Sequence, residues 1–194
     1  MKFEAGKVEV HKRSRLPHWH TEHGIYFVTF NLFDAIPKHV RIRIHEEAKA
    51  CQREDDKTWL QTKLGEALDE PHGSAFMHDP RIASLVANAI TYFDGERYDL
   101  FVWCVMPTHV HVVMTLSNGE RIDRIVQSWK SYSSKEANKL LGRVGSFWLE
   151  DYFDRTIRDS RELQNTIEYV LNNPVTAGLK DWPFVRLYPE RIPI

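Results

Sequence analysis

Two stretches rich in β-branched and aromatic residues lie almost next to each other and constrain the fold more than any other feature. They cover residues 98–105 and 109–116, and only Met106-Pro-Thr108 separates them. Runs of this composition are typical of strands, and a connection this short suits an antiparallel pair, because parallel strands need a much longer crossover. The two stretches therefore indicate a β-hairpin.

The segments around the hairpin have an order typical of α+β folds. The predicted elements are a strand at residues 26–33 and helices at residues 80–93, 121–141 and 160–173, with one or two exposed helices within residues 38–70. Asp79 and Asp159 are the expected N-caps, and Pro174 is expected to stop the last helix near Asn173. This order predicts a mostly antiparallel sheet covered by helices.

Two segments have weaker patterns. Residues 1–24 are polar and rich in histidine and are expected to form an irregular N-terminal arm, while residues 143–158 are aromatic and are expected to be irregular. A chain of 194 residues fits one domain. We therefore expect a single domain over residues 1–194, with a helical insertion at residues 38–80.

Composition excludes several classes of protein. Aromatic residues make up 12% of the chain, enough to fill a core, so a wholly disordered chain is excluded. There is no apolar run long enough for a membrane span and no apolar segment typical of a secretory signal near the N-terminus. The two cysteines, Cys51 and Cys104, are too few for a disulfide scaffold, and a reducing interior such as the bacterial cytoplasm is the expected location.

Charges are segregated although the net charge is only −1. Lysine and arginine outnumber acidic residues six to two in residues 121–143, whereas acidic residues outnumber basic ones eight to four in residues 46–70. This pattern is compatible with a basic face toward a phosphate backbone, and equally with scattered charges on solvated helices.

The sequence His109-Val-His111 is the strongest local signal for chemistry. Side chains in a strand alternate between faces, so the two imidazoles would project together, with Cα atoms roughly 6.5–7 Å apart, and Val110, Val112 and Met114 would face a core. Two imidazoles at this spacing can converge on one metal ion. The alternative is a pair of unrelated histidines, since the chain has ten.

Tyr169 and Asn173 form a second, weaker signal. They are four residues apart on a predicted helix and therefore share a face, outside the apolar arc of that helix. The tyrosine hydroxyl would be available to a polar cleft, and the asparagine amide oxygen could bind a hard cation. The alternative interpretation is that Tyr169 is a half-exposed tyrosine and Asn173 an ordinary asparagine at a helix end, neither with a catalytic role.

Taken together, the two signals suggest a site for DNA cleavage. Two imidazoles and one amide oxygen leave coordination positions on a divalent ion open for a phosphate oxygen. A nearby tyrosine hydroxyl could then attack the phosphorus and form a covalent phosphotyrosine.

The chain resembles the REP-associated tyrosine transposases, a branch of the single-tyrosine HUH transposase superfamily. The segments that carry the resemblance lie in the order typical of that family: residues 15–20 (RLPHWH), 26–30, 105–112 (VMPTHVHV), 128–131, 148–158 (WLEDYFDRTIR) and 169–179 (YVLNNPVTAGL). One departure is Thr108, because asparagine is usual before the first histidine.

The resemblance implies a ferredoxin-like α+β fold with a split βαβ core and a central antiparallel sheet. It also implies a Mg²⁺- or Mn²⁺-dependent enzyme that nicks single-stranded or hairpin DNA, leaves a 5′-phosphotyrosine and a free 3′-hydroxyl, and rejoins strands. His109, His111 and Asn173 would bind the metal ion and Tyr169 would be the nucleophile. A monomer is expected, although the superfamily includes homodimers.

Other residues compete for the catalytic and DNA-binding roles. Tyr152 is the alternative nucleophile, because it lies near two arginines. The candidate DNA contacts are Arg13, Arg15, Trp19, Lys130, Arg155 and Arg158.

Three other functions stay open. The chain could be a domesticated hairpin-binding regulator without catalysis, or a nickase of the relaxase or replication-initiator type. A metal-dependent ribonuclease fits less well, because no carboxylate accompanies the histidine pair.

Overall fold

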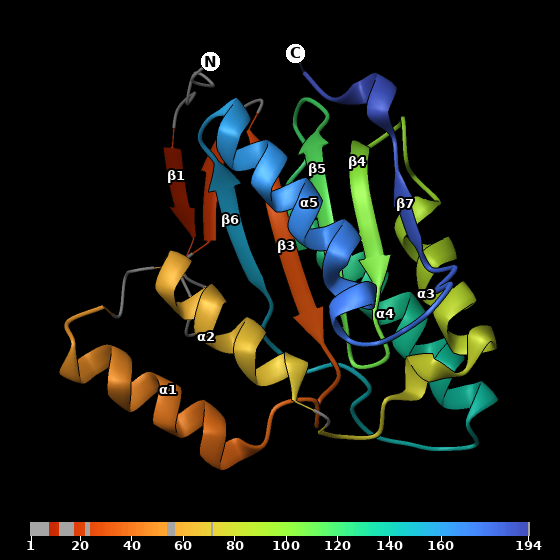
Figure 1. The fold of residues 1–194 in the computed structure, drawn as a ribbon. Helices are drawn as coiled ribbons and strands as arrows, with labels where there is room; N and C mark the ends of the chain where they lie inside the picture. The colour runs from red at the N-terminus through yellow and green to blue at the C-terminus, as the bar shows by residue number, and fades with distance from the viewer. Residues whose placement is uncertain (1–7, 12–17, 22–23, 54–56, 71, 194) are drawn as a thin grey trace.

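A five-stranded antiparallel sheet forms the centre of the protein in the computed structural model, which describes residues 8–11, 18–21, 24–53, 57–70 and 72–193 (Figure 1). The strand order is β6-β3-β5-β4-β7. The strands are β3 (Ile25–Asn31), β4 (Tyr98–Val105), β5 (His109–Leu116), β6 (Phe153–Ile157) and β7 (Val185–Leu187). The hairpin predicted from residues 98–116 is confirmed, because β4 and β5 pair antiparallel.

Helices cover both faces of the sheet. In Figure 1, α2 (Lys57–Asp69) and α5 (Ser160–Thr176) lie on the near face, while α3 (Pro80–Thr91) and α4 (Ile122–Leu140) lie behind it. The remaining helix, α1 (Lys38–Ala50), packs on α2. Strands β3 and β4 run parallel with β5 between them, as in a split βαβ unit, so the predicted α+β class is confirmed.

The alternation predicted for β5 is present, and both of its faces are buried. Val110, Val112 and Met114 belong to one core cluster, together with residues of α3 and α4. The opposite face, which carries His109 and His111, also carries Val113, and this residue belongs to a second cluster with apolar residues of α5. The imidazoles therefore lie between two layers of structure and not on an open sheet surface.

The predicted N-caps of two helices are confirmed. The Asp79 carboxylate accepts a hydrogen bond of 2.9 Å from the Arg81 backbone N–H at the start of α3, and the Asp159 carboxylate accepts one of 2.9 Å from the Glu162 N–H at the start of α5. Each bond satisfies an N–H group that has no partner inside its helix.

The predicted end of α5 is wrong by one turn. The helix continues through Pro174 and ends at Thr176; Ala177 is its C-cap, and Gly178 follows with a φ of +72° that suits glycine. In the last turn a proline removes only its own hydrogen bond toward Val170, and its fixed φ is compatible with a helix. Asn173 is thereby held inside a complete turn.

Two segments expected to be irregular contain strands. Within residues 1–24, β1 (Val8–His11) and β2 (His18–Thr21) pair antiparallel. Within residues 143–158, β6 pairs with β3. The reason is tertiary in the second case, because the open edge of β3 supplies the hydrogen bonds that the local sequence of β6 does not suggest.

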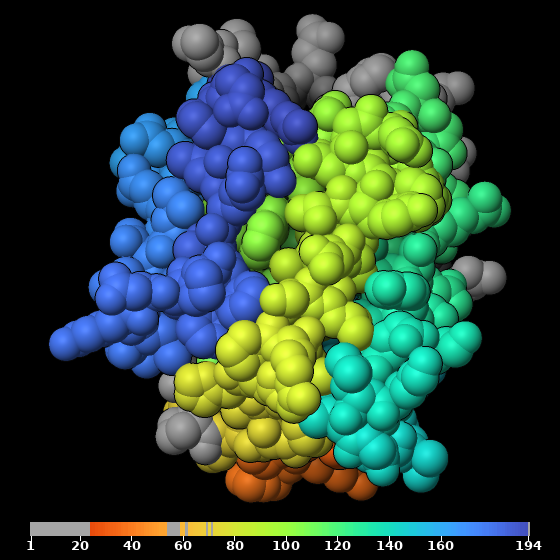
Figure 2. All heavy atoms as spheres, turned by 90° about the vertical axis from the view of Figure 1, so that its right-hand side faces the viewer, coloured from red at the N-terminus to blue at the C-terminus, as the bar shows by residue number. Residues whose placement is uncertain are grey.

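The C-terminal segment covers the other edge of the sheet. Trp182 donates a hydrogen bond of 2.7 Å from its indole nitrogen to the Val105 carbonyl, and Arg191 forms an ion pair with Asp94. Figure 2 shows this segment, in dark blue, alongside the yellow-green residues of α3 and its following turn. No helix in the described ranges is long and apolar enough to cross a membrane.

Candidate active site

His109 and His111 lie at the start of β5, opposite β3. The antiparallel register pairs His111 with Thr29 and His109 with Asn31. Both imidazoles are 2% exposed, and their ring centroids are 4.7 Å apart. The sequence prediction that the two rings project together is therefore confirmed.

Hydroxyl groups hold the Nδ1 atom of each ring. The Thr29 Oγ1 lies 2.8 Å from His111 Nδ1, and the Thr108 Oγ1 lies 3.0 Å from His109 Nδ1. The other nitrogen of His111, Nε2, is buried and has no hydrogen-bond partner within the described part of the chain. An unpaired buried nitrogen of this kind is a candidate metal ligand.

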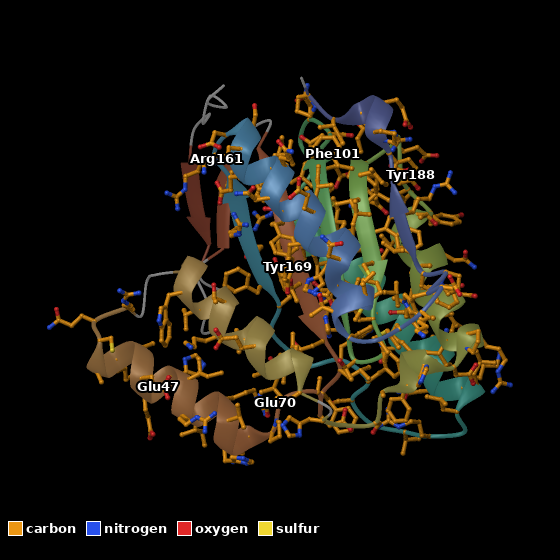
Figure 3. The ribbon with its side chains drawn as sticks, in the orientation of Figure 1. Glu47, Glu70, Phe101, Arg161, Tyr169 and Tyr188 are labelled. Carbon is orange, nitrogen blue, oxygen red and sulfur yellow. The ribbon has the colours of Figure 1, made fainter. Side chains whose placement is uncertain are left out.

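Tyr169 of α5 lies against this histidine pair. Its ring centroid is 5.3 Å from that of His111 and 6.1 Å from that of Phe27, both in edge-on arrangements. Figure 3 shows Tyr169 at the middle of the sheet, between α5 and α2. The side chain is 40% exposed, so one part of it packs on the site and another reaches solvent.

Asn173 follows one helical turn later and is buried. Its exposed fraction is 4%, and its side-chain oxygen Oδ1 makes no hydrogen bond to any described residue. The side chain lies beside His109, where it partly opposes the effect of burial on the histidine pKa. The structure thus brings together all four residues that the resemblance marks as catalytic or metal-binding.

Burial keeps both imidazoles neutral. It lowers the pKa of His109 to about 4 and lowers the pKa of His111 well below its ordinary value, and a protonated His109 beside His111 would lower the second pKa further. Metal ligands must present a free lone pair, so this environment favours the binding-competent form at neutral pH.

Helix α2 forms the wall opposite the sheet. A cavity of about 30 Å³ lies beside Tyr169 and is lined by Thr29, Asn31, Leu64, Gly65, Leu68, His111, Phe153 and Tyr169. A methyl group at Gly65 would lie only 3.4 Å from the Tyr169 hydroxyl oxygen.

Sequence reasoning missed Thr29, Gly65 and Phe27 as neighbours of the site. Strand alternation in residues 25–31 could have placed Phe27 and Thr29 on one face, but nothing in the sequence pairs that face with the histidines.

The alternative nucleophile, Tyr152, lies elsewhere. It lines a different cavity, between α4 and residues 146–152, and neither histidine contributes to that cavity. Burial raises the pKa of the Tyr152 hydroxyl, and the charge of Asp154 adds to this shift. The structure does not bring Tyr152 to the histidine pair.

The structure describes some of the predicted DNA contacts and leaves others outside the described residues. Arg13 and Arg15 lie outside the described residues, and for Trp19 the structure describes the backbone of β2 only. Lys130 donates hydrogen bonds of 2.7 and 2.6 Å to the Leu149 and Glu150 carbonyls, so a phosphate would have to compete with them.

The two remaining arginines differ from each other. Arg155 pairs with Glu162, donates to the Thr166 hydroxyl and lies over the Phe27 ring, so it contributes to the packing behind Tyr169. Arg158 is exposed. A DNA contact remains a prediction at every one of these positions.

Comparisons with known proteins relate this chain to transposases. The family model described as "Transposase IS200 like" matches residues 78–173, which span α3 to Asn173. The chain is 28% identical over 109 residues to a REP-associated tyrosine transposase of Haemophilus influenzae and 26% identical over 105 residues to one of Escherichia coli. These alignments cover 45% and 52% of this chain and 62% and 61% of the relatives' own lengths.

A solved structure has the same fold. A REP-associated tyrosine transposase bound to a REP hairpin superposes with a TM-score of 0.54 at 16% identity, over 89% of this chain and 81% of that one. The matched family segment contains the histidine pair, the tyrosine and the asparagine. The chain is therefore similar, over residues 78–173, to the IS200-like transposase family and, in sequence and fold, to the REP-associated tyrosine transposases.

Proposed function

We propose that the chain is a metal-dependent DNA nickase and strand transferase that acts on single-stranded DNA beside a hairpin. One observation carries the proposal: the Tyr169 ring lies 5.3 Å from His111, whose free nitrogen shares a buried site with the unpaired oxygen of Asn173. The relatives named as REP-associated transposases, and the REP hairpin bound by the structural neighbour, support hairpin DNA as the substrate.

The residues present fit a divalent cation. His111 Nε2 and Asn173 Oδ1 are buried acceptors without protein partners among the described residues, and His109 lies beside both. The amide oxygen suits Mg²⁺ or Mn²⁺, and of these two cations the transition metal Mn²⁺ is the better match for imidazole ligands. When bound, the cation would polarise the phosphodiester and stabilise the charge that develops on its oxygens.

The chemical step assigned to Tyr169 is a transesterification. Its hydroxyl oxygen forms a bond to phosphorus as the bond from phosphorus to the 3′-oxygen breaks, the tyrosine proton leaves to solvent, and the 3′-oxygen takes up a proton. The product is a 5′-phosphotyrosine and a free 3′-hydroxyl. Because the number of phosphoester bonds is unchanged, a 3′-hydroxyl of another strand can reverse the step and join the ends.

A labelled-strand assay tests the proposal. A library of DNA hairpins with randomised single-stranded flanks is incubated with the protein and Mn²⁺ and separated on a denaturing gel. We expect a covalent adduct that carries the 3′-end label, a shorter free fragment that carries the 5′-end label, and no adduct in EDTA. Hairpin binding without any adduct would contradict catalysis and favour the regulator.

A further inference from the structure

We propose that Thr29 is a positioning residue for the metal site: its hydroxyl accepts the Nδ1 hydrogen of His111 and thereby directs the Nε2 lone pair into the site. This inference rests on the proposed function, because it concerns how one proposed ligand is prepared. It is carried by the 2.8 Å contact between Thr29 Oγ1 and His111 Nδ1 and by the unpaired state of Nε2 among the described residues.

The choice of tautomer follows from burial. If Nε2 carried the hydrogen, a buried N–H group would lack an acceptor, which is unfavourable. If Nδ1 carries it, Thr29 accepts it and only a lone pair remains unpaired at Nε2. The second arrangement is the one that a metal ligand requires.

Thr29 is suited to this role by its place in the sheet. It lies within β3, directly opposite His111 in the register, and is 7% exposed. A β-branched side chain in a strand has restricted χ1 rotation, so the hydroxyl stays where the sheet places it. Thr108 differs, because it lies in the turn before β5 and is only partly buried, so water can replace its hydroxyl at His109.

Variants at Thr29 test the inference. Valine at this position keeps the shape and removes the hydroxyl, and we expect Thr29→Val to weaken Mn²⁺ binding in calorimetry by about 10–100-fold, the usual effect of losing such a partner. Thr29→Ser should restore affinity to within a few-fold of wild type. The matched control is Thr115→Val, because Thr115 is also a sheet threonine but bonds to the Gly24 carbonyl, away from the histidines.

A second measurement separates this inference from the proposed function. Nitrogen NMR shifts of the metal-free protein report which nitrogen of His111 carries the hydrogen, and we expect Nδ1 in wild type and in Thr29→Ser. Hydrogen on Nε2 in wild type would overturn the role of Thr29. Unchanged Mn²⁺ affinity in a folded Thr29→Val would also overturn it. Failure of wild type to bind Mn²⁺ would reject the metal site, while the NMR result would still decide the tautomer.

A different observation, the size of the cavity beside Tyr169, carries a second inference: we infer that α2 is a lid that must move before DNA reaches the buried histidine pair. With a volume of about 30 Å³, this cavity has room for ordered water but not for a nucleotide. Leu64, Gly65 and Leu68 form the α2 side of this cavity, opposite His111 and Tyr169.

Described residues on either side of α1 and α2 hold the base of this helical segment together. Asp34 follows β3 and Ser74 precedes α3, and the Asp34 carboxylate accepts hydrogen bonds from the Ser74 N–H and hydroxyl, so the two ends of the segment that carries α1 and α2 are joined. Between these points α1 packs on α2, so the two helices can move together. Glu47 and Glu70, labelled in Figure 3, are exposed on this acidic segment, which phosphates would repel.

Pulsed electron-spin distance measurements test the lid. Spin labels are attached through Glu66→Cys on α2 and Glu168→Cys on α5, both exposed, in a Cys51→Ser background; Cys104 is buried. We expect the label distance to increase when hairpin DNA binds. Without DNA, Leu68→Ser should shift the distribution toward the longer distances, because it weakens the closed contact, whereas Leu140→Ser on the exposed surface of α4 should not.

Each result decides the second inference. An unchanged distance in a protein that has bound DNA or formed the Tyr169 adduct would overturn the lid. An unchanged distribution in a folded Leu68→Ser would overturn it as well, even if no DNA bound and the proposed function failed.

Discussion

Replacing Tyr169 with phenylalanine is expected to abolish covalent capture of DNA, with a loss of at least about 10³-fold, as is typical when a nucleophile is removed. The substitution deletes only the hydroxyl oxygen. The ring keeps its edge-on contacts with His111 and Phe27, so the fold and the metal ligands should be preserved. Hairpin binding should stay within a few-fold of wild type, because phosphate and base contacts come from other side chains.

The matched control for this variant is Tyr152→Phe. Tyr152 lines the cavity against α4 and lies apart from the histidine pair, so its hydroxyl should be dispensable for the adduct. The measurement is the rate of adduct formation on the selected hairpin in Mn²⁺, with a melting curve for each variant. An adduct that survives Tyr169→Phe and is lost in Tyr152→Phe would assign the nucleophile to Tyr152.

The sequence predicts those parts of this protein that depend on local patterns. The enrichment of β-branched and aromatic residues in residues 98–105 and 109–116 predicted both strands with their observed bounds, because both strands are buried and the connection is too short for another topology. The aspartates at residues 79 and 159 predicted two helix starts for an equally local reason.

The parts that the sequence did not predict depend on distant partners. Strand β6 exists because β3 offers an open edge, and the contact between Thr29 and His111 spans 82 residues. The continuation of α5 past Pro174 depends on the packing of that turn, in which Pro174 itself is buried. None of these features has a periodic signature in its own segment.

The candidate site was predictable for a related reason. His109 and His111 share a strand and Tyr169 and Asn173 share a helix, so the period of each element placed its pair on one face. The family resemblance supplied the expectation that the two faces meet. The lid helix α2 had no such support, because its apolar residues interact with the site across the fold.

Acidification should destabilise the metal-free protein through its buried imidazoles. His109 has a pKa of about 4 in the folded protein and an ordinary value of 6.5 when unfolded, so the unfolded chain binds more protons between these values. The stability is fully present above pH 6.5 and falls as the pH drops toward 4. At 1.36 kcal/mol per pKa unit, His109 alone should lower the free energy of unfolding by about 2 kcal/mol from pH 7 to 5 and about 3 kcal/mol by pH 4.

Urea denaturation in EDTA between pH 7 and 5 measures this effect, in a range where few carboxylates titrate. In His109→Gln the decrease in the free energy of unfolding between pH 7 and 5 should be smaller by about 2 kcal/mol than in wild type, because the group that takes up the proton on unfolding is absent. Burial shifts the pKa of His111 in the same direction, so His111 should account for part of the pH dependence of the free energy of unfolding that remains in this variant. An equal slope in wild type and His109→Gln would show that His109 is not the group that couples proton uptake to unfolding.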